Sequence, residues 1–128
     1  MTLLETLHKP RRRKPPHDDG SARLCRLVEA AVAATFAVPV KELRAASRGR
    51  ADIAFARQTA IYLAHVGLGL SYSAIGRQFG RDRTTAAHAC RLVEERRDDP
   101  ATDRLLHLLE GLCADIARAM PAPAETRA

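Results

Sequence analysis

The sequence predicts an all-α fold organised around a helix-turn-helix. Apolar residues recur every three or four positions through the middle of the chain, which is the spacing of helices with one buried face. Pro, Gly and capping residues interrupt this pattern at intervals that suit separate helices. No segment alternates apolar and polar residues over the length of a β-strand. We therefore expect about five to six helices and no sheet.

The first helices are expected between an N-terminal tail and a polar loop. Ser21 is a suitable cap for a helix, because a serine hydroxyl can accept a hydrogen bond from the first helical turn. Pro39 stops or restarts the chain, and Val40 and Leu43 bracket one short turn of helix before the polar stretch at residues 46–50. The inner face of the first helix is predicted to consist of Leu24, Leu27, Val28, Ala31, Val32 and Thr35.

The next helix, over residues 53–67 with Asp52 as its cap, is expected to be the central and most buried one. Apolar residues line nearly its whole circumference and leave only a narrow polar stripe around Gln58. Gly67 and Gly69 then end it.

Two helices joined by a tight turn follow, over residues 71–78 and 82–97. Ser71 and Asp82 are suitable caps for them, and the turn contains Gly80. A turn of this length with a glycine lets the second helix leave at a steep angle, as entry into a DNA major groove requires. The pair is therefore a candidate helix-turn-helix.

The last helix is expected to start at Asp99 and Pro100, a cap followed by the residue favoured at the first helical position. Its inner stripe is predicted to be Leu105, Leu108, Leu109, Leu112 and Ile116. The sequence thus predicts one helix-turn-helix domain at residues 21–120. A disordered, basic and Pro-rich tail is expected at residues 1–20, and a second disordered tail at 121–128.

The charge of the chain favours a polyanionic partner. Lys and Arg number 21 against 15 Asp and Glu, so the net charge is +6. An arginine-rich composition also arises in GC-rich genomes, and charge alone therefore does not decide the partner. With no Trp and two Tyr, the chain has few side chains on which single-stranded bases can stack. Duplex DNA is the expected nucleic acid.

The cysteines and histidines do not suggest a catalytic or metal site. Cys25, Cys90 and Cys113 lie in apolar helical contexts and are expected to be small core residues in a reduced cytosol. No nucleophile, base and orienting group converge, so we expect no enzyme activity, cofactor or metal. No signal peptide or membrane-length apolar stretch occurs in the sequence, and the expected location is the cytoplasm, in association with the nucleoid.

The helix after Gly80 has one apolar face and one face rich in hydrogen-bonding groups. Ala86, Ala89, Cys90 and Val93 fall on the first face, and Thr84, His88, Arg91 and Glu95 on the second. Its first turn, Asp82-Arg83-Thr84-Thr85, offers an acceptor, a bidentate donor and two hydroxyls that are suited to reading base edges. Taken alone, these residues are equally compatible with a simple cap and first turn.

The segment 57–94 reads RQTAIYLAHVGLGLSYSAIGRQFGRDRTTAAHACRLVE. It closely resembles the C-terminal DNA-binding domain (domain IV) of the bacterial chromosomal replication initiator DnaA. That family has an RQ pair on its central helix, an S-x-x-x-I-G helix and the signature G-G-R-D-H-T-T-x-x-H-A. The resemblance extends over about residues 22–115 and implies an all-α helix-turn-helix domain that binds double-stranded DNA.

The resemblance also implies roles for individual residues. Arg48 or Arg50, in the loop before the central helix, would enter the minor groove, and Arg57 and Gln58 would contact phosphates. Ser73 would lie near flanking base or backbone positions. The signature would supply further DNA-binding residues, those from Asp82 onward in the major groove: Arg81, Asp82, Arg83, Thr84, Thr85 and His88.

The sequence departs from the family pattern at two positions. Phe79 stands where the family has the first glycine of its pair, and Arg83 stands where it commonly has His. Since Arg reaches farther than His and prefers guanine O6 and N7, the preferred DNA sequence is expected to differ from that of the initiator.

The sequence contains no G-x-x-x-x-G-K-[ST] motif, so we expect a DNA-binding protein without an ATPase module. Its expected role is regulation of chromosomal replication initiation at initiator-type sites, with duplex DNA as partner and the initiator or its regulators as further candidates. One alternative is a transcription regulator that dimerises through the last helix. Another is an adaptor that acts on proteins controlling initiation.

Overall fold

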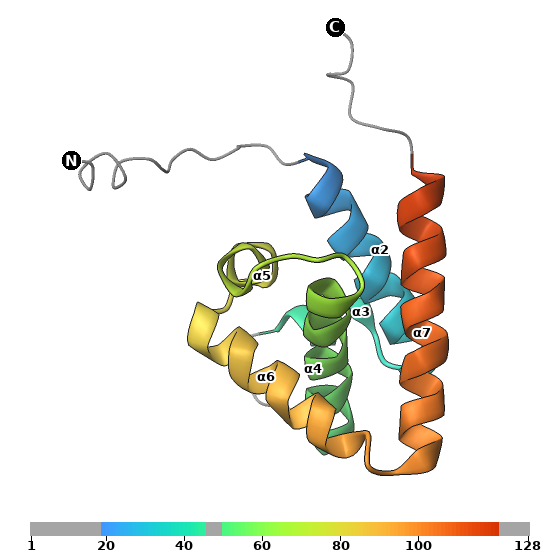
Figure 1. The fold of residues 1–128 in the computed structure, drawn as a ribbon. Coiled ribbons are helices and arrows are strands. Elements are labelled where there is room, and N and C mark those ends of the chain that lie inside the picture. Colours follow the sequence, from blue (N-terminus) through green and yellow to red (C-terminus); the bar gives the residue numbers. More distant parts are fainter. Residues whose placement is uncertain (1–18, 46–49, 121–128) are drawn as a thin grey trace, which may run out of the picture.

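The computed structural model describes residues 19–45 and 50–120, and it confirms the all-α fold class. Within these residues there are six helices and no strand (Figure 1). Of the expected tails at residues 1–20 and 121–128, residues 1–18 and 121–128 lie outside the described residues, and Asp19 and Gly20 are already helical. The helices are α2 (Asp19–Phe36), α3 (Val40–Arg44), α4 (Ala51–Val66), α5 (Tyr72–Phe79), α6 (Arg83–Arg96) and α7 (Pro100–Ala119).

Helix α4 is the centre of the fold, as its nearly continuous apolar surface predicts. It packs against α2, α3, α5, α6 and α7, and eight of its residues are buried. In Figure 1, α5 and the beginning of α6 lie on one side of α4, and α7 lies on the other. None of the helices in the described part of the chain has the length and hydrophobicity needed to cross a membrane.

Three of the expected helix caps are confirmed. The Ser71 hydroxyl accepts a hydrogen bond from the Ala74 backbone N–H at 3.1 Å. Asp82 and Asp99 accept bonds from the N–H groups of Thr85 and Thr102, at 2.7 and 2.9 Å respectively. Each bond satisfies a backbone donor that has no partner within its own helix.

Two other expected caps are wrong. Helix α2 begins at Asp19, so Ser21 lies in its first turn, where backbone N–H groups lack helical partners in any case. Helix α4 begins at Ala51 with Arg50 as its N-terminal cap, so Asp52 is already helical. The Asp52 carboxylate instead pairs with Arg50 at 3.2 Å and stabilises the start of the helix as an acidic first-turn residue.

The buried face of α2 is turned by one residue from the predicted stripe. Leu27 is 40% exposed and Thr35 is exposed, whereas Cys25 and Ala33 are buried beside Val28. Glu29 is the reason that the sequence misleads, because a carboxylate is unexpected on an inner face. It is only 2% exposed and is compensated by Arg26 at 3.0 Å and Arg44 at 3.6 Å.

The predicted stripe of α7 is partly wrong. Leu109 is buried and Leu105 and Ile116 are half-buried, but Leu108 is 70% exposed and Leu112 is 43% exposed. Leu106 and Cys113 take the inner positions. Because the leucines between 105 and 112 surround much of the helix, their spacing alone does not define which side faces α2 and α4.

A partly buried arginine joins α7 to the rest of the fold. Arg97, just after α6, donates to the Tyr62 hydroxyl of α4 at 2.8 Å. It also pairs with Asp103 and Glu110 of α7, and Tyr62 donates to Glu94 of α6.

Burial raises the pKa of the Cys113 thiol to about 11, with a further contribution from Glu110, so this core cysteine stays protonated at neutral pH.

Gly76 lets α5 approach the start of α6 closely, because it has no side chain. A Cβ atom on Gly76 would lie 2.4 Å from the Arg81 carbonyl oxygen, a distance too short for any side chain. The Arg81 N–H donates to the Gly76 carbonyl at 2.9 Å. This pair of backbone contacts therefore requires glycine at position 76.

We predict that Gly76→Ala lowers the free energy of unfolding by about 1 to 3 kcal/mol, because backbone must move to admit the methyl group. Gly111→Ala is the matched control, since a Cβ there meets nothing within 4 Å. This second change should be neutral or stabilising by about 0.5 to 1 kcal/mol, as expected for an exposed helical glycine. Urea unfolding followed by circular dichroism measures both. Equal stability of Gly76→Ala and wild type would contradict the tight contact.

The buried Glu29 predicts a pH dependence of stability. Burial raises its pKa above the ordinary 4.5, although Arg26 and Arg44 oppose the shift. Between pH 4.5 and the folded-state pKa, the folded protein therefore retains a proton that the unfolded chain has lost. The carboxyl contributes stability that is complete below this window and is lost as the pH rises through the folded-state pKa.

The measurement compares wild type with Glu29→Gln, which has no titrating group at this position. Urea unfolding between about pH 4 and 7 should show the wild type losing stability relative to the variant as the pH rises. A relative gain with rising pH would instead mean that the two arginines outweigh burial.

Candidate DNA-binding surface

The turn between α5 and α6 is closed by a single glycine. Gly80 has φ of +68°, the left-handed conformation that glycine adopts without steric cost, and its N–H donates to the Gly76 carbonyl. Phe79 is the last residue of α5 and does not have a positive φ. Its ring packs against the core and lies 5.6 Å from the Arg26 guanidinium. The departure from a Gly-Gly pair thus leaves the turn intact.

The first turn of α6 projects from the fold. Arg83, Thr84, Thr85 and, one turn later, His88 are all exposed. The opposite face of the helix is buried through Ala86, Ala89, Cys90 and Val93. The two faces are those that the sequence predicts, and the hydrogen-bonding side chains remain free to meet a partner.

Asp82 has a structural task in this turn. Hydrogen bonds from the Thr85 backbone and side chain lower the pKa of its carboxyl below the ordinary value, so it remains ionised. Its Oδ1 accepts the Thr85 N–H at 2.7 Å. Asp82 is therefore a cap first. As an exposed residue it also retains acceptor capacity that can face a partner.

Charge along α6 and the residues after it is unevenly distributed. Between Arg83 and Arg91 the helix carries two arginines and no carboxylate. The carboxylates Glu94, Glu95, Asp98 and Asp99 are gathered at the far end. The exposed first turn is therefore the end of the helix that suits a polyanion.

Two guanidinium groups meet at the end of α3. Arg57 of α4 donates through Nε to the Leu43 carbonyl at 2.9 Å and through its terminal nitrogen to the Glu42 carbonyl at 2.8 Å. Arg81 donates to the Ala45 carbonyl at 3.0 Å. Burial, and next the charge of Arg81, lower the pKa of Arg57, so the two cations interact. Among the described residues, no carboxylate forms an ion pair with either of them. Sequence patterns did not reveal this arrangement, because its acceptors are backbone carbonyls.

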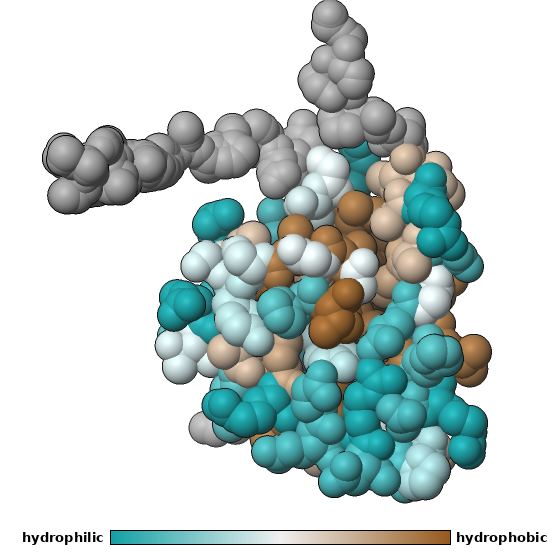
Figure 2. Space-filling view, viewed as in Figure 1, coloured by the Kyte–Doolittle hydropathy of each residue, from teal (hydrophilic) through white to brown (hydrophobic). Residues whose placement is uncertain are grey.

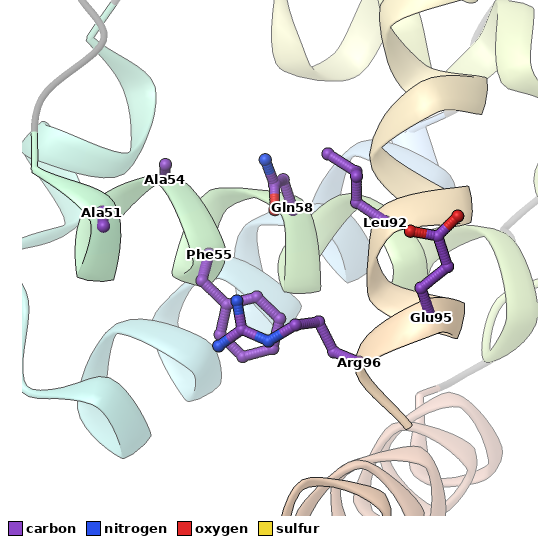
Figure 3. A pocket seen from close by; sticks show the side chains of 7 residues that line it. All are labelled: Ala51, Ala54, Phe55, Gln58, Leu92, Glu95 and Arg96. Carbon is purple, nitrogen blue, oxygen red and sulfur yellow. The ribbon is translucent and has the colours of Figure 1, made fainter. Parts of the chain in front are cut away.

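The adjacent residue, Gln58, faces a different surface. Its side chain lines a pocket between α4 and α6 together with Phe55, Leu92 and Glu95 (Figure 3). The Arg96 guanidinium lies over the Phe55 ring in the same pocket, 4.1 Å from its centroid. Successive helical residues point about 100° apart, so Arg57 and Gln58 have different neighbours within the fold.

The remaining candidate residues are placed as follows. Arg50 is exposed at the start of α4 and pairs with Asp52. Ser73 is exposed in the first turn of α5. Arg48 lies outside the described residues, so the structure leaves open which of Arg48 and Arg50 has the position implied for the minor groove.

Comparison with known proteins agrees with this geometry. The family described as the bacterial DnaA protein helix-turn-helix matches residues 25–93. DnaA 1 of Protochlamydia amoebophila is 42% identical over 65 residues, which are 51% of this chain and 14% of that protein. DnaA of Symbiobacterium thermophilum is 35% identical over 91 residues, 70% of this chain and 19% of that protein.

A solved structure described as a DNA replication initiation factor is similar in fold. It matches with a TM-score of 0.69 and 29% identity over 77% of this chain and 30% of that one. The chain therefore spans less than a third of the length of each of these three proteins. The family match itself includes more than half of the chain, from α2 to α6. The chain belongs to the family of the bacterial DnaA protein helix-turn-helix, a DNA-binding domain.

Proposed function

We propose that this protein binds double-stranded DNA in a sequence-specific manner and regulates chromosomal replication initiation. The observation that carries the proposal is the exposed first turn of α6, from Arg83 to Thr85. Its side chains combine donors, acceptors and methyl groups at a helix N-terminus that attracts phosphate. Arg81 lies two residues before Arg83 and adds positive charge, and its guanidinium donates to the Ala45 carbonyl.

In this proposal the first two turns of α6 lie in a major groove. Asp82, Arg83, Thr84, Thr85 and His88 face base edges, and Ser73 contacts flanking positions. The Arg83 guanidinium can donate two parallel hydrogen bonds to guanine O6 and N7. Its presence in place of His supports a preferred sequence that is shifted from the box of the initiator.

The two guanidinium groups at the end of α3, those of Arg57 and Arg81, support the proposed contacts to the DNA backbone. A guanidinium has five N–H groups, and Arg57 uses only two of them on carbonyls. The remaining groups of Arg57 and Arg81 are proposed to face phosphates. The hydrogen bond from Arg81 restrains Ala45, the last described residue before the loop with Arg48. We propose that this loop, or Arg50 after release from Asp52, reaches the minor groove, and that Gln58 contacts the backbone.

The biological role is inferred from the relatives and from the motifs in the sequence. The matched relatives are named chromosomal replication initiators. The sequence has the DNA-binding family region but no P-loop motif. We infer that the protein occupies initiator-type sites in the cytoplasm and alters initiation by competing with or assisting the initiator. A turn weakened by the missing glycine would favour the adaptor alternative, but Gly80 alone closes the turn, so this support is weak.

The first test compares two labelled duplexes by fluorescence anisotropy. One contains an initiator-type box, and the other has the same base composition in scrambled order. At about 0.15 M salt we expect binding to the box to be tighter by about a thousandfold or more, which is the lower end of specific recognition. Equal affinity for both duplexes would rule out specific recognition of initiator-type sites, and no binding to either would rule out the proposed function.

A second test separates base contacts from backbone contacts. Thr84→Ala and His88→Ala should each reduce discrimination between the duplexes by about 1 to 3 kcal/mol, while binding to scrambled DNA changes little. Arg57→Ala should weaken both duplexes alike and reduce the slope of log affinity against log salt by about 1. Thr35→Ala and Arg118→Ala are matched controls, because both side chains are exposed on other helices. If only Arg57→Ala reduced discrimination between the duplexes, Arg57 would be a base contact, and Thr84 and His88 would not be.

A further inference from the structure

The outer side of α7 carries hydrophobic surface that the fold does not use. Leu108 is 70% exposed and Leu112 is 43% exposed. Figure 2 shows this hydrophobic colouring along the outer edge of α7, between hydrophilic side chains. Isolated exposed leucines are ordinary, but these two lie one helical turn apart on the same side of one helix.

The residues beside these leucines form an ordered stripe. Arg104, Leu108, Gly111 and Asp115 follow one another at intervals of four, three and four positions, so they share one face of α7. All four are exposed, and a Cβ added to Gly111 would meet nothing within 4 Å. The stripe therefore has a protruding leucine, an adjacent open position and an opposite charge at each end.

This order is self-complementary in one orientation only. When two copies of α7 run antiparallel about an axis between residues 109 and 110, Leu108 of each copy lies opposite Gly111 of the other. The same axis sets Arg104 of each copy opposite Asp115 of the other. A parallel pair would instead bring Arg104 against Arg104 and Asp115 against Asp115, which is unfavourable.

We propose that the α7 stripe, Arg104, Leu108, Gly111 and Asp115, is the docking surface for a second copy of this chain. Each Leu108 side chain inserts at the Gly111 of its partner, and two ion pairs between Arg104 and Asp115 close the ends of the contact. Asp115 already pairs with Arg118 within its own helix, and an exposed carboxylate has room to accept both arginines. The contact is isologous, as a two-fold dimer requires.

The dimer is expected to be weak and independent of DNA binding. One pair of helices buries less surface than a standard stable interface, so a dissociation constant on the order of 10 to 100 µM is expected. The N-terminus of α6 lies on the other side of the fold from α7 (Figure 1). Dimerisation therefore leaves the DNA-binding turn uncovered in both copies.

Sedimentation equilibrium from about 5 to 500 µM tests the proposal, because this range brackets the expected dissociation constant. The wild-type mass should rise from the 14.0 kDa of the monomer toward twice that value. Leu108→Glu should remain monomeric, whereas Leu27→Glu, at an exposed leucine of α2, should dimerise like wild type. A monomeric wild type at the highest concentration, or a Leu108→Glu dimer, overturns the proposal.

A charge exchange tests the antiparallel arrangement. Arg104→Asp and Asp115→Arg should each weaken the dimer at least fivefold, because each creates two like-charge contacts. The double variant restores both ion pairs in reverse and should return to within about twofold of wild type, as expected for directly coupled positions. A double variant as weak as the single ones refutes this pairing.

Two controls exclude unfolding and altered DNA binding as causes of a changed mass. Circular dichroism of every variant verifies that the helices are retained. The box-duplex affinity of Leu108→Glu, measured below the dissociation constant of the dimer, should equal that of wild type. The sedimentation result does not depend on DNA, so a failure of the dimer and a failure of the proposed function are distinguishable.

Discussion

The DNA-binding surface depends on the backbone contact between Gly76 and Arg81. The two main chains approach so closely that no side chain fits at position 76, and the Arg81 N–H donates to the Gly76 carbonyl. This contact defines where α6 leaves the turn, and with it the direction of the first turn of α6. It also places the Arg81 side chain within reach of Ala45. One steric constraint thereby positions both the proposed base-reading residues and part of the proposed phosphate site.

The arginines of this protein have two kinds of partner, carboxylates in some places and backbone carbonyls in others. Arg97 joins α4, α6 and α7 through a tyrosine and two carboxylates, and Arg26 and Arg44 compensate the buried Glu29. Arg57 and Arg81 instead bind backbone carbonyls, and within residues 19–45 and 50–120 neither forms an ion pair with a carboxylate. A high arginine content is thus divided between cohesion of the fold and a surface suited to a polyanion.

The two proposed surfaces lie on opposite sides of α4 (Figure 1). The first turn of α6 is directed away from α7, whose outer stripe retains Leu108 in an exposed position (Figure 1). Residue by residue, the α6 surface is rich in groups that make directional hydrogen bonds, whereas the α7 stripe relies on shape and charge order.

The sequence by itself determined the helix class, the tight turn and the identity of the inner and outer faces of α6. These features follow from local rules, namely helical periodicity, capping and the φ of Gly80, and α6 has one unmistakable apolar side. The tertiary structure decided which of several possible helix faces is buried, because local rules do not distinguish them. The buried face of α2 differs from the predicted one because Arg44, distant in sequence, compensates the buried Glu29. In α7, packing on α2 and α4 determines which leucines are buried. The separate surroundings of Arg57 and Gln58 and the need for glycine at position 76 likewise arise from contacts between segments, which no single helix encodes.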